Sequence, residues 1–180
     1  MFKLNLPTFN FILSKKNSKK FIFDIIRKKH YVLTPEEWVR QNLIHYLIFN
    51  LKYPKSLIKV ETKLNYNNLT KRADILVYDH NLSIKLLVEC KSFKVKLNKS
   101  AFDQASVYNK IFKSEYLMVS NGINHFCCKY DWKNKTLINV DSFPKYESLN
   151  KIRYTLIVKI KSITNFFINY ITRNYIQPFF

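Results

Sequence analysis

Two apolar segments joined by a short polar turn constrain the fold of this chain more than any other feature. Residues 71–79 read K-R-A-D-I-L-V-Y-D and residues 84–91 read I-K-L-L-V-E-C-K, and both are typical of strands that lie in a protein core. The H-N-L-S stretch between them predicts a turn. With the turn centred between Asn81 and Leu82, the strands form an antiparallel hairpin in which the numbers of opposed residues sum to 163.

This register brings charged residues together near one end of the hairpin. It places Asp74 directly opposite Glu89, and Arg72 directly opposite Lys91. Directly opposed side chains have Cβ atoms ~4.5–5.5 Å apart, and residues two positions apart in a strand point to the same side. We therefore expect Asp74, Glu89 and Lys91 to converge on one patch.

These three side chains have the chemistry of a metal-assisted hydrolytic site. Two close carboxylates repel each other, and a divalent cation such as Mg²⁺, or Mn²⁺ as a substitute, relieves the repulsion. A neighbouring lysine can orient an attacking water and stabilise charge that develops on a phosphate. The alternative is a solvated strand end with a surface ion pair, because an E-x-K tripeptide is expected about once by chance in so lysine-rich a chain.

The remaining elements predict an α/β fold. A helix is expected from residue 35 to about residue 50, because Thr34 can cap it, Pro35 suits its first position and Glu37 completes a capping box. A second helix, with Ser100 as a possible cap, is expected over 100–112. Further strands are expected at 56–64, 116–120, 125–130 and 136–140. The order of helix, three strands, helix and further strands predicts a mixed β-sheet flanked by helices.

The two ends of the chain are less regular. Residues 8–26 predict a hairpin-like pair of apolar segments around the basic loop S-K-K-N-S-K-K. We expect one domain over 1–150 and a C-terminal extension over 151–180. That extension favours an amphipathic helix, although its alternating apolar residues also allow a strand, and its basic residues allow a helix that lies on a membrane surface.

Composition limits the possible functions. The chain carries 31 Lys and Arg against 12 Asp and Glu, a formal charge of +19, which favours nucleic acid or anionic lipid as a partner. An AT-rich genome would produce part of the same bias. The single glycine, Gly122, excludes a Walker A loop and a dinucleotide-binding fingerprint. The cysteines and histidines have no disulfide or zinc spacing, and no apolar run is long enough to span a membrane, so we expect a cytoplasmic protein.

Several motifs together resemble a known family. An acid on one strand and E-x-K on the next, preceded by a helix that carries glutamate, is similar to the PD-(D/E)xK nuclease superfamily. More narrowly, the chain resembles the type I restriction enzyme R protein N-terminal domain over roughly residues 4 to 148. The motifs that carry the resemblance are T-P-E-E-W-V-R-Q, K-R-A-D-I-L-V-Y-D, L-L-V-E-C-K, F-D-Q-A-S-V-Y-N and Y-L-M-V-S-N-G.

The resemblance implies a restriction-endonuclease-like fold and specific residue roles. Asp74 and Glu89 would bind Mg²⁺, and Lys91 would assist the nucleophilic water. The glutamate on the helix would be Glu37, or else Glu36, although Glu37 could also serve only as a cap. Gln104 and Tyr108 match a Q-x-x-x-Y motif, in which Gln104 would be catalytic and Tyr108 would contact nucleic acid, or both could simply pack on the sheet. Arg72 would contact a phosphate or balance the two acids.

These observations predict a metal-dependent nuclease that hydrolyses DNA phosphodiester bonds, with a separate motor or specificity subunit as a possible partner. The chain has no motor motif of its own, so ATP-driven translocation is not implied. The alternative is a catalytically silent module of the same fold that binds nucleic acid or another subunit.

Overall fold

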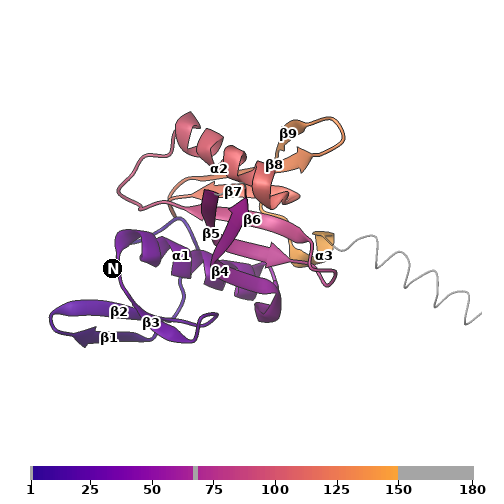
Figure 1. The fold of residues 1–180 in the computed structure, drawn as a ribbon. Coiled ribbons are helices and arrows are strands. Elements are labelled where there is room, and N and C mark those ends of the chain that lie inside the picture. Colours follow the sequence, from indigo (N-terminus) through magenta and orange to yellow (C-terminus); the bar gives the residue numbers. More distant parts are fainter. Residues whose placement is uncertain (1, 67–68, 150–180) are drawn as a thin grey trace, which may run out of the picture. The chain divides into compact units, whose positions relative to one another are not determined.

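The computed structural model describes residues 2–66 and 69–149, which fall into two units that divide after Pro144. The first unit holds all of the described strands and the two long helices (Figure 1). In the second unit, the described part contains a short helix, α3 (Tyr146–Leu149). The helical extension predicted over 151–180 lies outside the described residues.

A six-stranded mixed sheet forms the centre of the first unit. Its strands follow chain order across the sheet, and all neighbours are antiparallel except β6 and β7, which are parallel. A parallel pair needs a long crossover, which helix α2 (Lys99–Phe112) provides between β6 and β7. The strands are β4 (Ile58–Tyr66), β5 (Leu69–Tyr78), β6 (Ile84–Cys90), β7 (Tyr116–Ser120), β8 (His125–Asp131) and β9 (Thr136–Asn139).

Both faces of this sheet are covered at its centre. Ile75, Leu76 and Val77 follow one another in β5, and each is 0% exposed. Because neighbouring strand residues point to opposite faces, burial of all three requires a layer on each side. Helix α1 (Pro35–His45) contacts β5 and β6, and α2 contacts β6 and β7. The two helices lie on opposite sides of the sheet (Figure 1).

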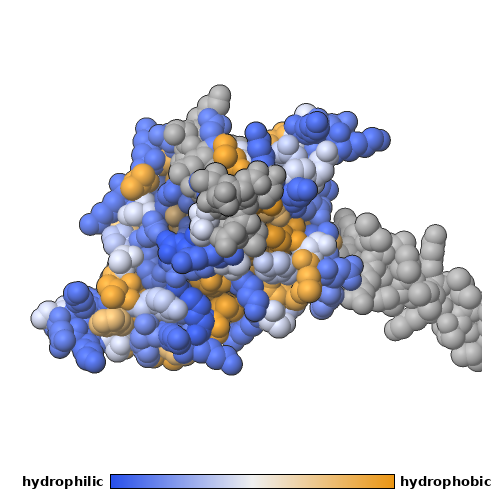
Figure 2. Space-filling view, in the orientation of Figure 1, coloured by the Kyte–Doolittle hydropathy of each residue, from blue (hydrophilic) through white to orange (hydrophobic). Residues whose placement is uncertain are grey.

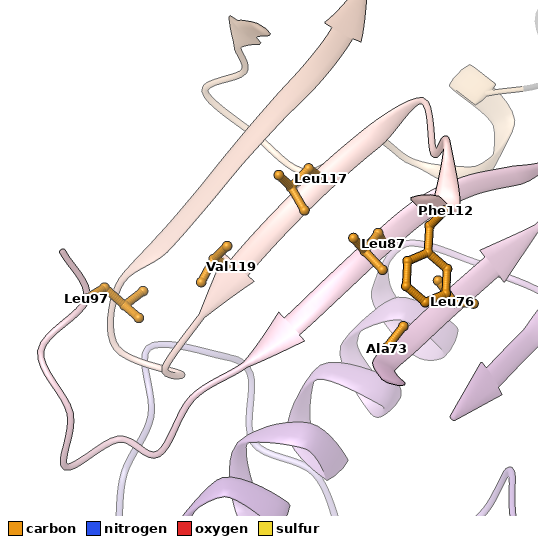
Figure 3. Packing of buried hydrophobic residues seen from close by; sticks show 7 residues of the cluster. All are labelled: Ala73, Leu76, Leu87, Leu97, Phe112, Leu117 and Val119. Atoms are coloured by element: carbon orange, nitrogen blue, oxygen red, sulfur yellow. The ribbon is translucent and has the colours of Figure 1, made fainter. Parts of the chain in front are cut away.

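A cluster of apolar side chains fills the space between the sheet and α2. In Figure 3, Phe112 at the end of α2 reaches over β5 and β6, while α1 passes behind the sheet. Burial of one leucine or phenylalanine side chain stabilises a fold by about 1.5–3 kcal/mol, so this layer accounts for a large part of the core. The cluster consists of Ala73, Leu76, Leu87, Leu97, Phe112, Leu117 and Val119.

Helix α1 begins as the sequence predicts, but its capping box is incomplete. The Oγ1 of Thr34 accepts a hydrogen bond of 3.0 Å from the Glu37 amide, and Pro35 occupies the first position. The Thr34 amide, however, donates to the carbonyl of Val32. The prediction that Glu37 completes the box is therefore wrong, because its carboxylate is held by arginines instead. The helix continues to Asn50 through a π-helical turn, Tyr46–Asn50.

A smaller three-stranded antiparallel sheet precedes α1. It consists of β1 (Leu13–Lys16), β2 (Lys19–Asp24) and β3 (Lys29–Val32). The hairpin predicted over 8–26 is present, but its loop has only two residues, Asn17 and Ser18, with φ of 47° and 61°. The lysines assigned to the loop belong to the strands, and β3 was not predicted.

The predicted fold class is confirmed, since a mixed sheet flanked by helices follows the expected order of elements. Helix α2 starts at Lys99, so Ser100 lies inside the helix and the proposal that it caps the helix is wrong. Among the residues that the structure describes, no helix combines the length and the apolar character needed to cross a membrane.

The single glycine lies in a tightly packed turn that follows β7. Gly122 has φ of +80°, a conformation that disfavours residues with a Cβ atom. A Cβ atom there would lie 2.8 Å from Cδ2 of Leu4 and 3.2 Å from Cγ2 of Val39. The carbonyl of Gly122 also accepts a hydrogen bond of 2.7 Å from the Asn5 amide. The N-terminal segment thus packs closely against this turn.

We expect Gly122→Ala to lower the free energy of unfolding by about 1–3 kcal/mol, because the added methyl group overpacks the site. Equilibrium unfolding in urea measures this loss. Leu4→Ala makes room for the methyl group, so the double variant should lose less stability than the sum of the two single losses. Additive losses would show that contact with Leu4 is not the cause.

Candidate active site

Asp74 lies where the pairing of β5 with β6 ends. The ladder pairs Ile75 with Val88 in the register that the turn predicts. Asp74 is buried, and its Oδ2 accepts a hydrogen bond of 2.7 Å from the Cys90 amide. The hairpin therefore holds Asp74 at the end of β6, where Glu89 lies.

Glu89 and Lys91 form the second part of the site. The Lys91 Nζ donates a hydrogen bond of 2.9 Å to Glu89 Oε1. Burial, and then the charge of Asp74, raises the pKa of Glu89, although Lys91 opposes this shift. Burial by itself would lower the pKa of Lys91, but its hydrogen bond to Glu89 and the charge of Asp74 raise it. The three residues thus form one charged cluster, in which the charge of Asp74 disfavours ionisation of Glu89.

Arg40 of α1 supplies a buried cation that the sequence analysis did not identify. Its Nη2 donates to Oδ1 of Asp74 at 2.8 Å and to Oε1 of Glu36 at 3.2 Å, and its Nη1 donates to Oε2 of Glu37. Arg40 is 4% exposed. Its Nε has no hydrogen-bond partner among the described residues. Arg40 therefore sits against three carboxylates, one of which is the predicted metal ligand Asp74.

A second arginine, Arg27, extends this cluster into the turn between β2 and β3. Its Nε donates to Oδ2 of Asp24 at 2.6 Å, and its Nη atoms donate to Glu37 and Glu61. Glu37 therefore accepts from both arginines. We refer to the two arginines and the acids that they contact as the arginine network, which comprises Arg27, Arg40, Asp24, Glu36, Glu37, Glu61 and Asp74.

Two further features complete the network. The Nε2 of Gln41 donates to Asp24 at 2.7 Å and to Glu37 at 2.9 Å. Glu61 has φ of +51°, which interrupts the pairing of β4 with β5 at the level of Asp74. Neither a capping motif nor a hydrophobic pattern in the sequence indicates that the residues of the arginine network come together. The one sequence feature that could have indicated the network is the high density of charged residues in P-E-E-W-V-R-Q. In the sequence, that motif was interpreted as a helix start.

The network and the Glu89–Lys91 pair are acidic in an otherwise basic protein. Together with Arg72, which contacts Glu61 from outside the network, they comprise six carboxylates, from Asp24, Glu36, Glu37, Glu61, Asp74 and Glu89, against four cations, from Arg27, Arg40, Arg72 and Lys91. This local excess of two negative charges contrasts with a chain charge of +19. Half of the 12 acidic residues in the chain gather here, so the region attracts a cation.

The other predicted site residues have different outcomes. Glu37 lies in the arginine network. Arg72 is 52% exposed at its side chain and contacts Glu61 at 3.2 Å. The predicted pairing of Arg72 with Lys91 is not formed, because the ladder between β5 and β6 ends at Ile75 and Val88, and β6 itself ends at Cys90. Gln104 and Tyr108 belong to α2, but their side chains lie outside the described part of the structure.

The donors of Asp74 and Glu89 fit a magnesium ion in kind. Both are hard carboxylate oxygens, and Mg²⁺ is commonly bound through one or two carboxylates while it keeps several waters. Within the described residues, no group of three or more His, Cys, Asp or Glu side chains could hold a metal. One Glu89 oxygen accepts from Lys91, and Asp74 accepts from Arg40 and the Cys90 amide. A metal would therefore have to share Asp74 with Arg40 or displace it.

Comparison with known proteins identifies the family. The family model for the type I restriction enzyme R protein N terminus (HSDR_N) matches residues 35–144. The chain belongs to this family. The resemblance drawn from the motifs is thereby confirmed, and the match covers α1, the whole six-stranded sheet and α2. Residues before Pro35, which include β1 to β3, lie outside it.

One solved structure is also similar to the chain. It is a fragment of a protein proposed to be an HsdR subunit of a type I restriction enzyme from Vibrio vulnificus, at 21% sequence identity and a TM-score of 0.35. The similarity covers 52% of this chain and 18% of that one, so this chain spans less than a fifth of the length of the solved fragment. No curated protein matches the chain.

We expect Arg40→Gln to cost about 3–5 kcal/mol of stability, because it leaves buried carboxylates without their counter-ion. Arg72→Gln is the matched control, since it removes an arginine that contacts one acid at the surface and should cost less than about 1 kcal/mol. Urea unfolding of both variants measures the difference. Equal losses would contradict the assignment of Arg40 as a structural counter-ion.

We expect Glu89→Gln to be more stable than the wild type at neutral pH in the absence of divalent metal. A carboxyl group whose pKa is raised by folding contributes stability that is lost as the pH rises through that pKa. The glutamine variant lacks this loss, so its advantage should vanish at acidic pH, where Glu89 is protonated. Thermal unfolding over a pH series tests this. Glu115→Gln, which removes a carboxylate that contacts Lys85 and Lys129, should give no such gain.

Proposed function

We propose that this domain is a Mg²⁺-dependent nuclease that hydrolyses DNA phosphodiester bonds. The observation that carries the proposal is the convergence of Asp74, Glu89 and Lys91 within a locally acidic site of a basic protein. Membership in the family of the type I restriction enzyme R protein N terminus supports a role in restriction. A separate motor or specificity subunit would act beside this chain in the cytoplasm.

Each residue of the site has a distinct role in this proposal. Asp74 and Glu89 would hold the metal, whose charge would polarise the phosphate and lower the pKa of a bound water. The Cys90 amide holds Asp74 in place through its hydrogen bond of 2.7 Å. Glu37 is a positioning residue, since its carboxylate contacts both arginines and does not contact Asp74. Gln104 would act beside the metal, and Arg72 and Tyr108 would contact the nucleic acid.

Lys91 acts as a cation rather than as a base. Its pKa is raised by Glu89 and Asp74 against the effect of burial, so it remains an ammonium ion at neutral pH. An ammonium ion has no lone pair with which to take a proton from water. It can donate hydrogen bonds to the attacking water and to a phosphate oxygen on which negative charge increases. The proton of the attacking water must therefore be transferred to an acceptor other than Lys91.

A catalytically silent module that binds nucleic acid or another subunit is the second candidate. The observation in its favour is that protein cations already contact both acids. Arg40 contacts Asp74 at 2.8 Å, and Lys91 contacts Glu89 at 2.9 Å. A domain that has lost metal binding would keep its structure through such internal pairs.

Cleavage with two metals separates these candidates. Supercoiled plasmid, single-stranded DNA and RNA are incubated with the protein in Mg²⁺ or Mn²⁺ and in EDTA. We expect metal-dependent cutting of DNA, and we expect Lys91→Ala to cut more slowly by about 10²–10³, because one preorganised electrostatic contact is lost. Lys91→Arg should not restore the full rate, since a planar guanidinium does not replace a compact ammonium.

Thermal unfolding provides a readout that does not depend on cutting. Metal should raise the unfolding temperature of the wild type and of Lys91→Ala, because ligand that binds the native state stabilises it. Asp74→Ala should lose this gain. Absence of cutting in every condition, with no metal-induced gain in the wild type, would favour the silent module. Equal cutting by wild type and Lys91→Ala would remove Lys91 from the mechanism.

A further inference from the structure

The tip of the β1–β2 hairpin gathers four lysines at a very short turn. Asn17 and Ser18 both have positive φ, as a two-residue type I′ turn requires. Lys15 pairs directly with Lys20, and Lys16 with Lys19. The end of this hairpin is hydrophilic at its surface (Figure 2). The four lysines are exposed, and none has an ion-pair partner within the described residues.

This arrangement works against the stability of the hairpin. Like charges directly opposite each other across two strands are destabilising. No acidic side chain among the described residues offsets them. An AT-rich composition explains many lysines, but it does not explain two opposed pairs at a tip where nothing neutralises them. A polyanion that binds there would relieve the repulsion.

The two lysine pairs point to different faces of the hairpin. Side chains alternate along a strand, so Lys20 shares a face with Ile22 and Asp24, which are both 0% exposed. Lys15 lies opposite Lys20 and shares this face, while Lys16 and Lys19 point away from it. The hairpin therefore has an inner face, defined by Lys15, Lys20, Ile22 and Asp24.

The inner face leads towards the candidate active site. Asp24 at its far end accepts hydrogen bonds from Arg27 and Gln41 and so belongs to the arginine network. Lys20 lies four residues away, which corresponds to about 14 Å along a strand. Lys15 and Lys20 also line an open hollow of about 440 Å³ together with Leu13, Ser14 and Leu33. Its polar groups, two ammonium ions and a hydroxyl, suit a phosphate of a nucleic-acid backbone.

We propose that the exposed end of the inner face of the β1–β2 hairpin holds duplex DNA through Lys15 and Lys20 and aligns it with the candidate active site. Two ammonium ions on one face can contact phosphates of the DNA backbone, which position a protein on the duplex and supply much of its affinity. The proposal rests on the proposed function, in which DNA is the substrate. It adds a contact surface that lies wholly outside the residues matched by the family.

The test compares two double variants of equal charge. Lys15→Gln with Lys20→Gln removes the inner pair, and Lys16→Gln with Lys19→Gln removes the outer pair as the matched control. Binding of a labelled DNA duplex is measured in EDTA by fluorescence anisotropy over a series of salt concentrations. Because each neutralised phosphate contributes about 0.9 to the slope of log K against log salt, loss of the inner pair should reduce the slope by about 2. Loss of the outer pair should reduce it by less than about 1.

Further measurements keep the outcomes distinct. Neither double variant should unfold at a lower temperature than wild type, since each removes a repulsive pair, and Lys15→Arg with Lys20→Arg should retain binding. Equal slopes for the inner and outer variants would overturn the proposal, as would an unchanged slope for the inner variant. If duplex RNA bound more tightly than duplex DNA, and its salt slope fell in the same way when the inner pair was removed, the choice of DNA would be overturned. Because binding is read in EDTA, failure of wild-type cleavage would count against the nuclease alone.

Discussion

The position of one carboxylate, that of Glu37, determines how the parts of the first unit meet. It accepts hydrogen bonds from Arg27 in the turn after β2, from Arg40 on its own helix and from Gln41. Arg27 also forms an ion pair with Glu61 of β4, and Arg40 also forms an ion pair with Asp74 of β5. Two sheets and a helix therefore converge on charged groups that are largely out of water. Such groups are costly to bury, and their mutual pairing limits the arrangements that the chain can adopt.

The features that the sequence predicted are those set by local pattern. The apolar runs in β5 and β6 and the short turn between them fixed a register, and the observed pairing of Ile75 with Val88 follows it. That register is what places Asp74 near Glu89. The start of α1 was predictable for the same reason, because Thr34 and Pro35 act within one helical turn. Short-range rules of turn geometry and capping were sufficient for both.

The features that the sequence did not predict depend on contacts between distant segments. Glu37 has the spacing of a capping-box residue, yet its carboxylate accepts hydrogen bonds from two arginines, and the Thr34 amide donates to the carbonyl of Val32 instead. Glu61 has a positive φ and pairs with Arg27 and Arg72, and no local rule predicts either feature. The predicted pairing of Lys91 with Arg72 fails because β6 ends at Cys90, before Lys91, which no turn rule predicts. Charge complementarity over long sequence separations has no periodic signature.

The close packing around Gly122 has a consequence for where this domain begins. The family match starts at Pro35, but Leu4 and Asn5 already lie against the turn after β7, and Trp38 of α1 donates to the carbonyl of Phe2. A protein truncated to begin at Pro35 would expose the face of α1 that packs against the N-terminal segment. Glu37 would then lose Arg27 and keep only Arg40 as an arginine partner. Residues that lie before the family match therefore belong to the same packed structure as α1 and β7.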